Sequence, residues 1–121
     1  MRFIQEQGFT IKLGQEEAFQ GWLVANEAAL AAAAPAGTKY LGTFTAVFSS
    51  GKRSGLYKMY MEHDSYGPLD ALAASMKDEA SDFSRLMRES FRFGDYDLAA
   101  PWSSGLYKAV VDASIFNPEV A

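Results

Sequence analysis

The sequence has no cysteine and one histidine, His63, among its 121 residues. The lack of cysteine excludes disulfides, thiolate chemistry and cysteine-ligated metals, and a single histidine excludes a multi-histidine metal site within one chain. The chain also lacks a GxSxG nucleophile motif, an HExxH helix and a phosphate-binding glycine loop. We therefore expect no metal and no cofactor.

Positive charge and long apolar runs are scarce as well. The net charge of −4 and the isoelectric point near 4.9 argue against nucleic acid as a partner, because its phosphates require a basic surface. The longest apolar stretch, residues 28–36, falls well short of the roughly 20 residues that span a bilayer. The segment MRFIQEQGF carries no apolar run of the signal-peptide kind. We expect a cytoplasmic protein with no membrane partner.

Apolar and aromatic residues are plentiful, at 49% and 14% of the chain. This content is enough for one globular core but too little for two. We expect a single domain over residues 1–121, with a core of about 2–113 and a C-terminal tail over 114–121.

Hydrophobic periodicity predicts four strands and two helical stretches. The strands are expected at residues 3–13, 38–49, 56–62 and 105–113, and the helices from Gln15 to Pro35 and from Gly67 to Ser90, with a break at Lys77–Asp78. The resulting order, β-α-β-β-α-β, predicts a ferredoxin-like α+β sandwich, which is a four-stranded antiparallel sheet with helices on one face. In that fold the strands lie in the order 4-1-3-2.

The pentapeptide SGLYK occurs twice, at Ser54–Lys58 and Ser104–Lys108. If the fold had arisen by internal duplication, the first strand would correspond to the third and the second to the fourth. The two copies lie in the third and fourth strands, so the repeat does not come from such a duplication. Coincidence between two similar strands is one interpretation. A shared role in binding is the other, because alternation places Leu and Lys of each copy on one face of the sheet.

Strand alternation assigns two faces to the sheet. The face expected beneath the helices is apolar; it holds Phe3, Phe9, Tyr40, Phe44, Tyr57, Met59, Met61 and Tyr107. The other face is mixed; it holds Ile4, Glu6, Leu41, Thr43, Lys58, Tyr60, Leu106 and Lys108. A β-bulge would exchange these assignments locally.

The mixed face is too apolar for solvent and needs a cover, which a second copy of the chain would provide. We expect a homodimer through this face, enclosing a cavity for a small organic ligand. Lys58 and Lys108 are expected to flank Glu6 there. They either form a solvated Lys–Glu–Lys pairing or hold an anionic or carbonyl-bearing ligand, with Tyr60 as a second donor. Leu41 and Thr43 are expected to line the same cavity, and Trp102 either caps it or simply covers an open end.

His63 is the only side chain whose unperturbed pKa lies near neutrality, so it is the candidate general base, with Tyr60 as the second catalytic candidate. In MEHDSYG it follows the third strand. A solvated histidine at a strand end is the structural alternative.

The segments FTIKLGQEEAFQGW and KYLGTFTAVFSSGKRSGLYKMYM, together with the strand order, resemble the dimeric α/β-barrel superfamily over roughly residues 2–113. Within it the chain is most similar to NIPSNAP-like and antibiotic-biosynthesis-monooxygenase-like proteins.

The resemblance implies a homodimer with a ligand cavity between sheet and helices in each protomer. Members of the superfamily include cofactor-independent monooxygenases, haem-degrading oxygenases and small-molecule isomerases. Haem-binding members use an axial histidine on a helix, and the position of His63 near a strand end departs from this pattern. We expect a small-molecule-binding protein, either a cofactor-independent monooxygenase or isomerase acting on a partly apolar compound, or a non-catalytic module for ligand sensing or protein association.

Overall fold

The structure, a computed structural model, describes residues 2–47, 56–96 and 103–111. These residues form four strands and three helices. They are β1 (Phe3–Phe9), α1 (Glu16–Ala33), β2 (Thr38–Thr45), β3 (Tyr57–His63), α2 (Gly67–Lys77), α3 (Asp82–Phe91) and β4 (Ser103–Lys108). The predicted element order is confirmed, and the second helical stretch divides near the predicted break.

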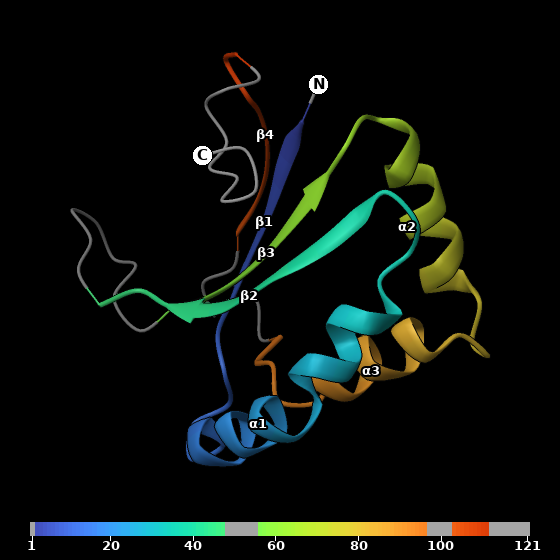
Figure 1. Cartoon of the computed structure of the whole chain (residues 1–121). Helices are drawn as coiled ribbons and strands as arrows, with labels where there is room; N and C mark the ends of the chain where they lie inside the picture. The colour runs from blue at the N-terminus through green and yellow to red at the C-terminus, as the bar shows by residue number, and fades with distance from the viewer. Residues whose placement is uncertain (1, 48–55, 97–102, 112–121) are drawn as a thin grey trace.

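The strands form one sheet in the order β2-β3-β1-β4, and all neighbouring strands are antiparallel. This is the predicted order 4-1-3-2 of a ferredoxin-like α+β fold. The helices lie on one side of the sheet (Figure 1). We call the opposite side, on which none of the three described helices packs, the far face.

The boundaries of α1 follow from its flanking residues. Gly14 has a φ of 86°, in the left-handed region that favours glycine, and turns the chain just before the helix. Glu16 and Glu17 lie in the first turn, where the helix dipole favours negative charge. The helix ends at Ala33 because Pro35 disfavours helical backbone at the residue before it. No described helix is both long and apolar enough to cross a membrane.

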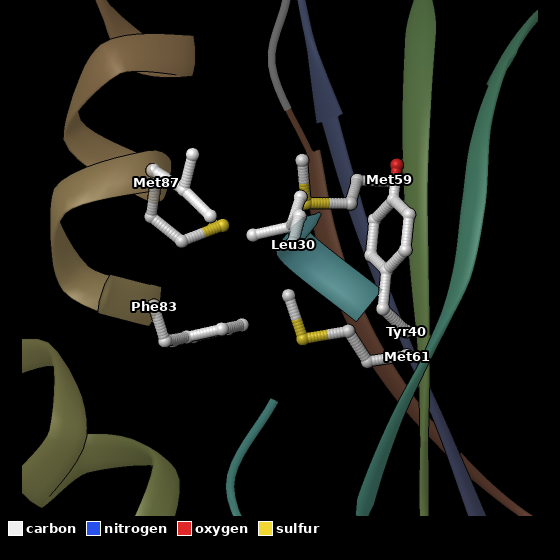
Figure 2. Close-up of a cluster of buried hydrophobic side chains, with 7 residues drawn as sticks. Leu30, Tyr40, Met59, Met61, Phe83 and Met87 are labelled. Carbon is white, nitrogen blue, oxygen red and sulfur yellow. The ribbon is translucent and has the colours of Figure 1, made fainter. Parts of the chain in front are cut away.

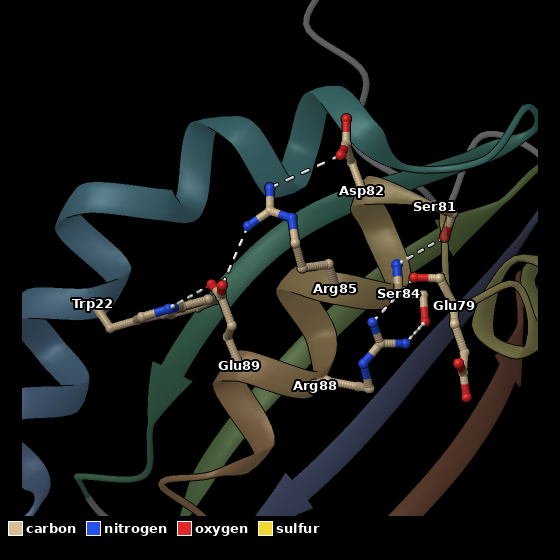
Figure 3. Close-up of polar contacts among 8 residues, drawn as sticks. All are labelled: Trp22, Glu79, Ser81, Asp82, Ser84, Arg85, Arg88 and Glu89. Carbon is tan, nitrogen blue, oxygen red and sulfur yellow. Dashed lines mark hydrogen bonds and ion pairs between the residues drawn. The ribbon is translucent and has the colours of Figure 1, made fainter.

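The division between α2 and α3 has a local cause as well. Ser81 caps α3, since its hydroxyl accepts a hydrogen bond from the backbone N–H of Ser84 at 3.0 Å (Figure 3). α2 begins with Pro68 in its first turn, where the missing N–H of proline has no cost. The two helices therefore start from separate signals.

The core lies between the helices and the strands β2 and β3 (Figure 2). Its buried members come from α1, the sheet and α3; they are Leu30, Tyr40, Met59, Met61, Phe83, Leu86 and Met87. Methionines supply three of these side chains, and their unbranched thioethers fill irregular gaps between layers. The predicted inward positions of Tyr40, Met59 and Met61 are confirmed.

A polar link joins α1 to α3 on the outside of this core (Figure 3). The indole Nε1 of Trp22 donates to Glu89 Oε2 at 3.3 Å, and Arg85 Nη1 donates to Glu89 Oε1 at 3.2 Å. Arg85 also lies 3.9 Å from Asp82, so it takes part in local pairing within α3. The ion pairs of Arg85 are exposed and contribute little stability.

β2 contains a bulge between Tyr40 and Gly42, where its register against β3 shifts by one residue. Gly42 has a φ of 137°, which other residues rarely adopt. Beyond the bulge the predicted faces are exchanged, so two expectations were wrong. Thr43 lies on the helix side opposite Met59, and Phe44 lies on the far face opposite Lys58.

β4 also departs from the predicted faces. Glu6 of β1 lies opposite Gly105, and Phe3 lies opposite Lys108. Because directly opposed residues share a face, Lys108 and Leu106 point to the helix side and Tyr107 to the far face. The expectation that Lys108 flanks Glu6 was therefore wrong. The face on which Lys108 lies depends on how β4 is aligned with β1, and the alternation of residues within β4 does not reveal this alignment.

Candidate functional site

The far face holds a cluster of polar side chains that we call the far-face cluster: Glu6, Lys58, Tyr60 and Ser103. Lys58 Nζ lies 2.5 Å from Glu6 Oε1, and Tyr60 OH donates to Glu6 Oε2 at 3.0 Å. A carboxylate can only accept hydrogen bonds, so the proton of Tyr60 is directed to Glu6. Tyr60 is thus a partner of Glu6 rather than the second free donor expected from the sequence.

β1 and β3 bring these groups together because Glu6 lies directly opposite Tyr60 in their ladder. Lys58, two residues before Tyr60, is on the same face and only 9% exposed. Its ammonium also lies 3.4 Å from Ser103 Oγ of β4. A lysine this deeply desolvated requires a charged partner, and Glu6 supplies it.

Gly8 of β1 lies beneath the contact between Lys58 and Ser103. It lies opposite Lys58 on one side and Ser103 on the other. A Cβ at Gly8 would overlap Ser103 Oγ and would lie 3.1 Å from Leu56 Cδ2 and 3.5 Å from Lys58 Nζ. The absence of a side chain at this position therefore leaves room for Ser103 Oγ beside the ammonium of Lys58.

We expect Gly8→Val to displace Ser103 and the ammonium of Lys58 from their positions. Overpacking of this kind costs about 1–3 kcal/mol of unfolding free energy. Urea denaturation measures the loss, and Gly21→Ala is the control, because nothing lies within 4 Å of a Cβ at Gly21. Equal stability of Gly8→Val and the wild type would contradict this packing.

Aromatic rings surround the far-face cluster. The rings of Phe44 and Tyr60 meet edge to face with centroids 5.7 Å apart. Phe44 and Tyr107 are each 54% exposed, so the cluster adjoins apolar surface open to contact. Burial, followed by the hydrogen bond to Glu6, raises the pKa of Tyr60 above its ordinary value, so its hydroxyl stays protonated at neutral pH.

The two SGLYK copies point their lysines to opposite faces. Lys58 lies opposite Gly8 on the far face, and Lys108 lies opposite Phe3 on the helix side. The two lysines lie opposite β1 residues that are five positions apart, which is an odd number, so the repeat builds no symmetric Lys–Glu–Lys arrangement. The structure unites Glu6, Lys58 and Tyr60 and separates Lys108 from them.

The remaining predicted cavity residues have other positions. Thr43 Oγ1 lies 2.6 Å from the hydroxyl of Tyr40, which donates to Glu27 Oε1 at 3.0 Å, so Thr43 belongs to a polar contact between β2 and α1. Leu41 lies at the bulge and is 39% exposed. Trp102 lies outside the described residues.

His63 is completely buried on the helix side of the sheet, not solvated at a strand end. Its Nε2 lies 2.9 Å from Gln5 Oε1, and its Nδ1 lies 2.9 Å from Thr38 Oγ1. Gln5 Oε1 can only accept, so Nε2 carries the proton and Nδ1 of the neutral ring accepts from Thr38. His63 therefore faces away from the far-face cluster. Its position matches neither interpretation from the sequence, a general base at that cluster or a solvated histidine at a strand end.

Desolvation lowers the pKa of His63, and the nearby Asp64 opposes this only in part. The unfolded chain then binds more protons than the folded protein below about pH 6.5. We expect stability to fall as the pH decreases below about 6.5 and through the lowered pKa of His63 in the folded protein, and we expect His63→Gln to remove this slope. Urea denaturation across this range measures it; an equal slope in both proteins would contradict the assignment.

No group of three or more His, Cys, Asp or Glu side chains in residues 2–47, 56–96 and 103–111 could hold a metal ion. The contacts of the far-face cluster include the Lys58–Glu6 ion pair and the hydrogen bonds of Tyr60 and Ser103. Ser103 was not identified from the sequence as part of the cluster, and Gly8 and Phe44 were not identified as its neighbours. The sequence did contain one signal for the position of Phe44. A glycine inside a strand often marks a β-bulge, and a bulge at Gly42 moves Phe44 to the far face.

Comparisons with known proteins agree with this fold. Neither a protein-family model nor a curated protein sequence matches the chain. A NIPSNAP family protein from Agrobacterium tumefaciens superposes with a TM-score of 0.63 at 7% identity, covering 89% of this chain and 92% of that one. An uncharacterized NIPSNAP domain protein from Burkholderia xenovorans gives 0.63 at 8% identity, covering 91% and 96%.

A third match is a candidate antibiotic biosynthesis monooxygenase from Nitrosomonas europaea, with a TM-score of 0.57 at 12% identity, covering 90% of this chain and 99% of that one. Identities this low establish the fold and not the activity. The resemblance found in the sequence is thereby confirmed at the level of the fold: the chain has the ferredoxin-like α+β architecture found in NIPSNAP proteins and in this monooxygenase-like protein.

Proposed function

We propose that the protein binds a small, partly apolar molecule on the far face, in contact with the far-face cluster. One observation carries the proposal: a desolvated Lys58–Glu6 pair, hydrogen-bonded to Tyr60, lies beside exposed aromatic rings on the sheet face opposite the three described helices. Such a combination of apolar walls with a few convergent polar groups is typical of ligand sites.

We further propose that a second copy of the chain covers the far face. Phe44 and Tyr107 are half-exposed there, and a shared apolar patch is most often buried by a two-fold dimer. The ligand would then lie between the sheets of the two copies. The superposed NIPSNAP structures support the same sheet architecture and leave the pairing to experiment.

Binding without catalysis is the version that the position of His63 favours. An enzyme that uses His63 as general base at this site would direct its imidazole to the far face, whereas both ring nitrogens are engaged beneath the helices. A cofactor-independent monooxygenase or isomerase is the alternative, and it would depend on Glu6, Lys58 and Tyr60. The monooxygenase-like neighbour supports this alternative through its fold alone.

Native mass spectrometry of the freshly purified protein tests both parts of the proposal. We expect a dimer that carries a discrete additional mass, which is lost in Lys58→Met. Phe44→Glu is expected to yield monomers, because it places a charge in the shared apolar patch. A wild-type monomer at micromolar concentration, without additional mass, would argue against the dimer and the ligand together.

A further inference from the structure

The charge balance of the far-face cluster restricts which ligand it can accept. The ammonium of Lys58 and the carboxylate of Glu6 neutralise one another across 2.5 Å, and both side chains are largely withdrawn from water. An anionic ligand that approaches Lys58 must also approach Glu6, and like charges repel strongly where water is excluded. The free positive charge that an anion requires is therefore absent.

A neutral acceptor does not meet this obstacle. An ammonium has three N–H donors, and here two of them meet Glu6 and Ser103. The third can be given to a carbonyl oxygen without displacing Glu6. The edge-to-face rings of Phe44 and Tyr60 provide the adjoining apolar surface, on which a planar molecule can pack.

We propose that Glu6 determines ligand specificity, selecting a neutral, planar, carbonyl-bearing molecule over an anion of the same shape. This inference rests on the proposed function, since it concerns the same site. Removing the charge of Glu6 while keeping its shape leaves Lys58 as an uncompensated cation. Glu6→Gln therefore converts the site into one that prefers anions.

Two probes of matched shape test the inference on the full chain: 2-acetonaphthone, which is neutral, and 2-naphthoate, which is anionic. Chemical shifts of backbone amides, followed during titration, give both the affinity and the location. We expect wild-type protein to bind 2-acetonaphthone at least about tenfold more tightly than 2-naphthoate. Glu6→Gln reverses this order.

Glu62→Gln is the matched control. It removes the same charge from the same face, but Glu62 pairs with Arg2 at 3.6 Å and not with Lys58. The order of the two probes at Lys58 should stay as in the wild type. The wild-type comparison decides the preference even if Glu6→Gln fails to fold.

Two failures are distinguishable. If the wild type binds 2-naphthoate as tightly as 2-acetonaphthone, or Glu6→Gln keeps the wild-type order, the inference is overturned and the proposed ligand site stands. If neither probe gives saturable shifts at the far-face cluster in any of these proteins, the proposed function falls, and the role of Glu6 falls with it.

Discussion

Lys58→Met is expected to lower the free energy of unfolding by about 3 kcal/mol, whereas Lys108→Met changes it by no more than about 0.5 kcal/mol. Both lysines end a copy of SGLYK, so their local sequences are the same. Their surroundings differ, because Lys58 is 9% exposed and paired with Glu6, whereas Lys108 is exposed opposite Phe3. Methionine at position 58 leaves the carboxylate of Glu6 desolvated without its cation.

Urea denaturation followed by circular dichroism measures both variants under the same conditions. The double variant Lys58→Met with Glu6→Leu is expected to regain much of the lost stability, because an apolar pair can replace a buried ion pair. Equal effects of the two lysine variants would show that Lys58 is not desolvated. The assignment of the sheet faces would then be wrong.

Phe19→Ala is expected to lower the free energy of unfolding by about 4 kcal/mol. Phe19 is completely buried at the centre of a group of aromatic rings. Its ring centroid lies 5.5–6.4 Å from those of Phe9, Trp22, Tyr57 and Phe93. Truncation removes these contacts and leaves a cavity that four rings on different segments cannot collapse to fill.

Val24→Ala on the same helix is the control, because Val24 is 90% exposed and its loss creates no cavity. We expect it to change stability by no more than about 0.5 kcal/mol. Thermal unfolding of the two variants separates burial from helix propensity, since each introduces alanine into α1. A loss below about 1 kcal/mol for Phe19→Ala would mean that this end of the core is loosely packed.

The fold could be predicted because its signals are periodic and local. The helical spacing around Phe19 and the stop at Pro35 depend only on neighbours in sequence, as does the alternation around Met59 and Met61. The order of these elements then leaves few topologies open, and the predicted strand order proved correct.

The site could be predicted only in part, because side-chain direction across strands depends on register. Glu6, Lys58 and Tyr60 were placed correctly, since β1 and β3 pair without a bulge. The bulge at Gly42 and the offset of β4 arise from strand pairing, so Thr43 and Lys108 were assigned to the wrong face. A shift of one residue in the register of a strand moves every later side chain of that strand to the opposite face of the sheet.

The burial of His63 could not be predicted from the sequence either. Its two partners, Gln5 and Thr38, come from different strands and are 58 and 25 residues away in the chain. Nothing near His63 in the sequence indicates either contact. A near-neutral pKa in isolation made it the obvious base, yet the fold uses it as a neutral hydrogen-bonding side chain between strands.

The most direct test of the central claim, that ligand binds on the far face, is the map of backbone amide shifts on titration with 2-acetonaphthone. We expect the largest shifts at Glu6, Lys58, Tyr60 and Ser103. Shifts concentrated instead at Gln5, Met61 and His63, whose side chains lie on the helix side, would place the ligand between sheet and helices and contradict the claim.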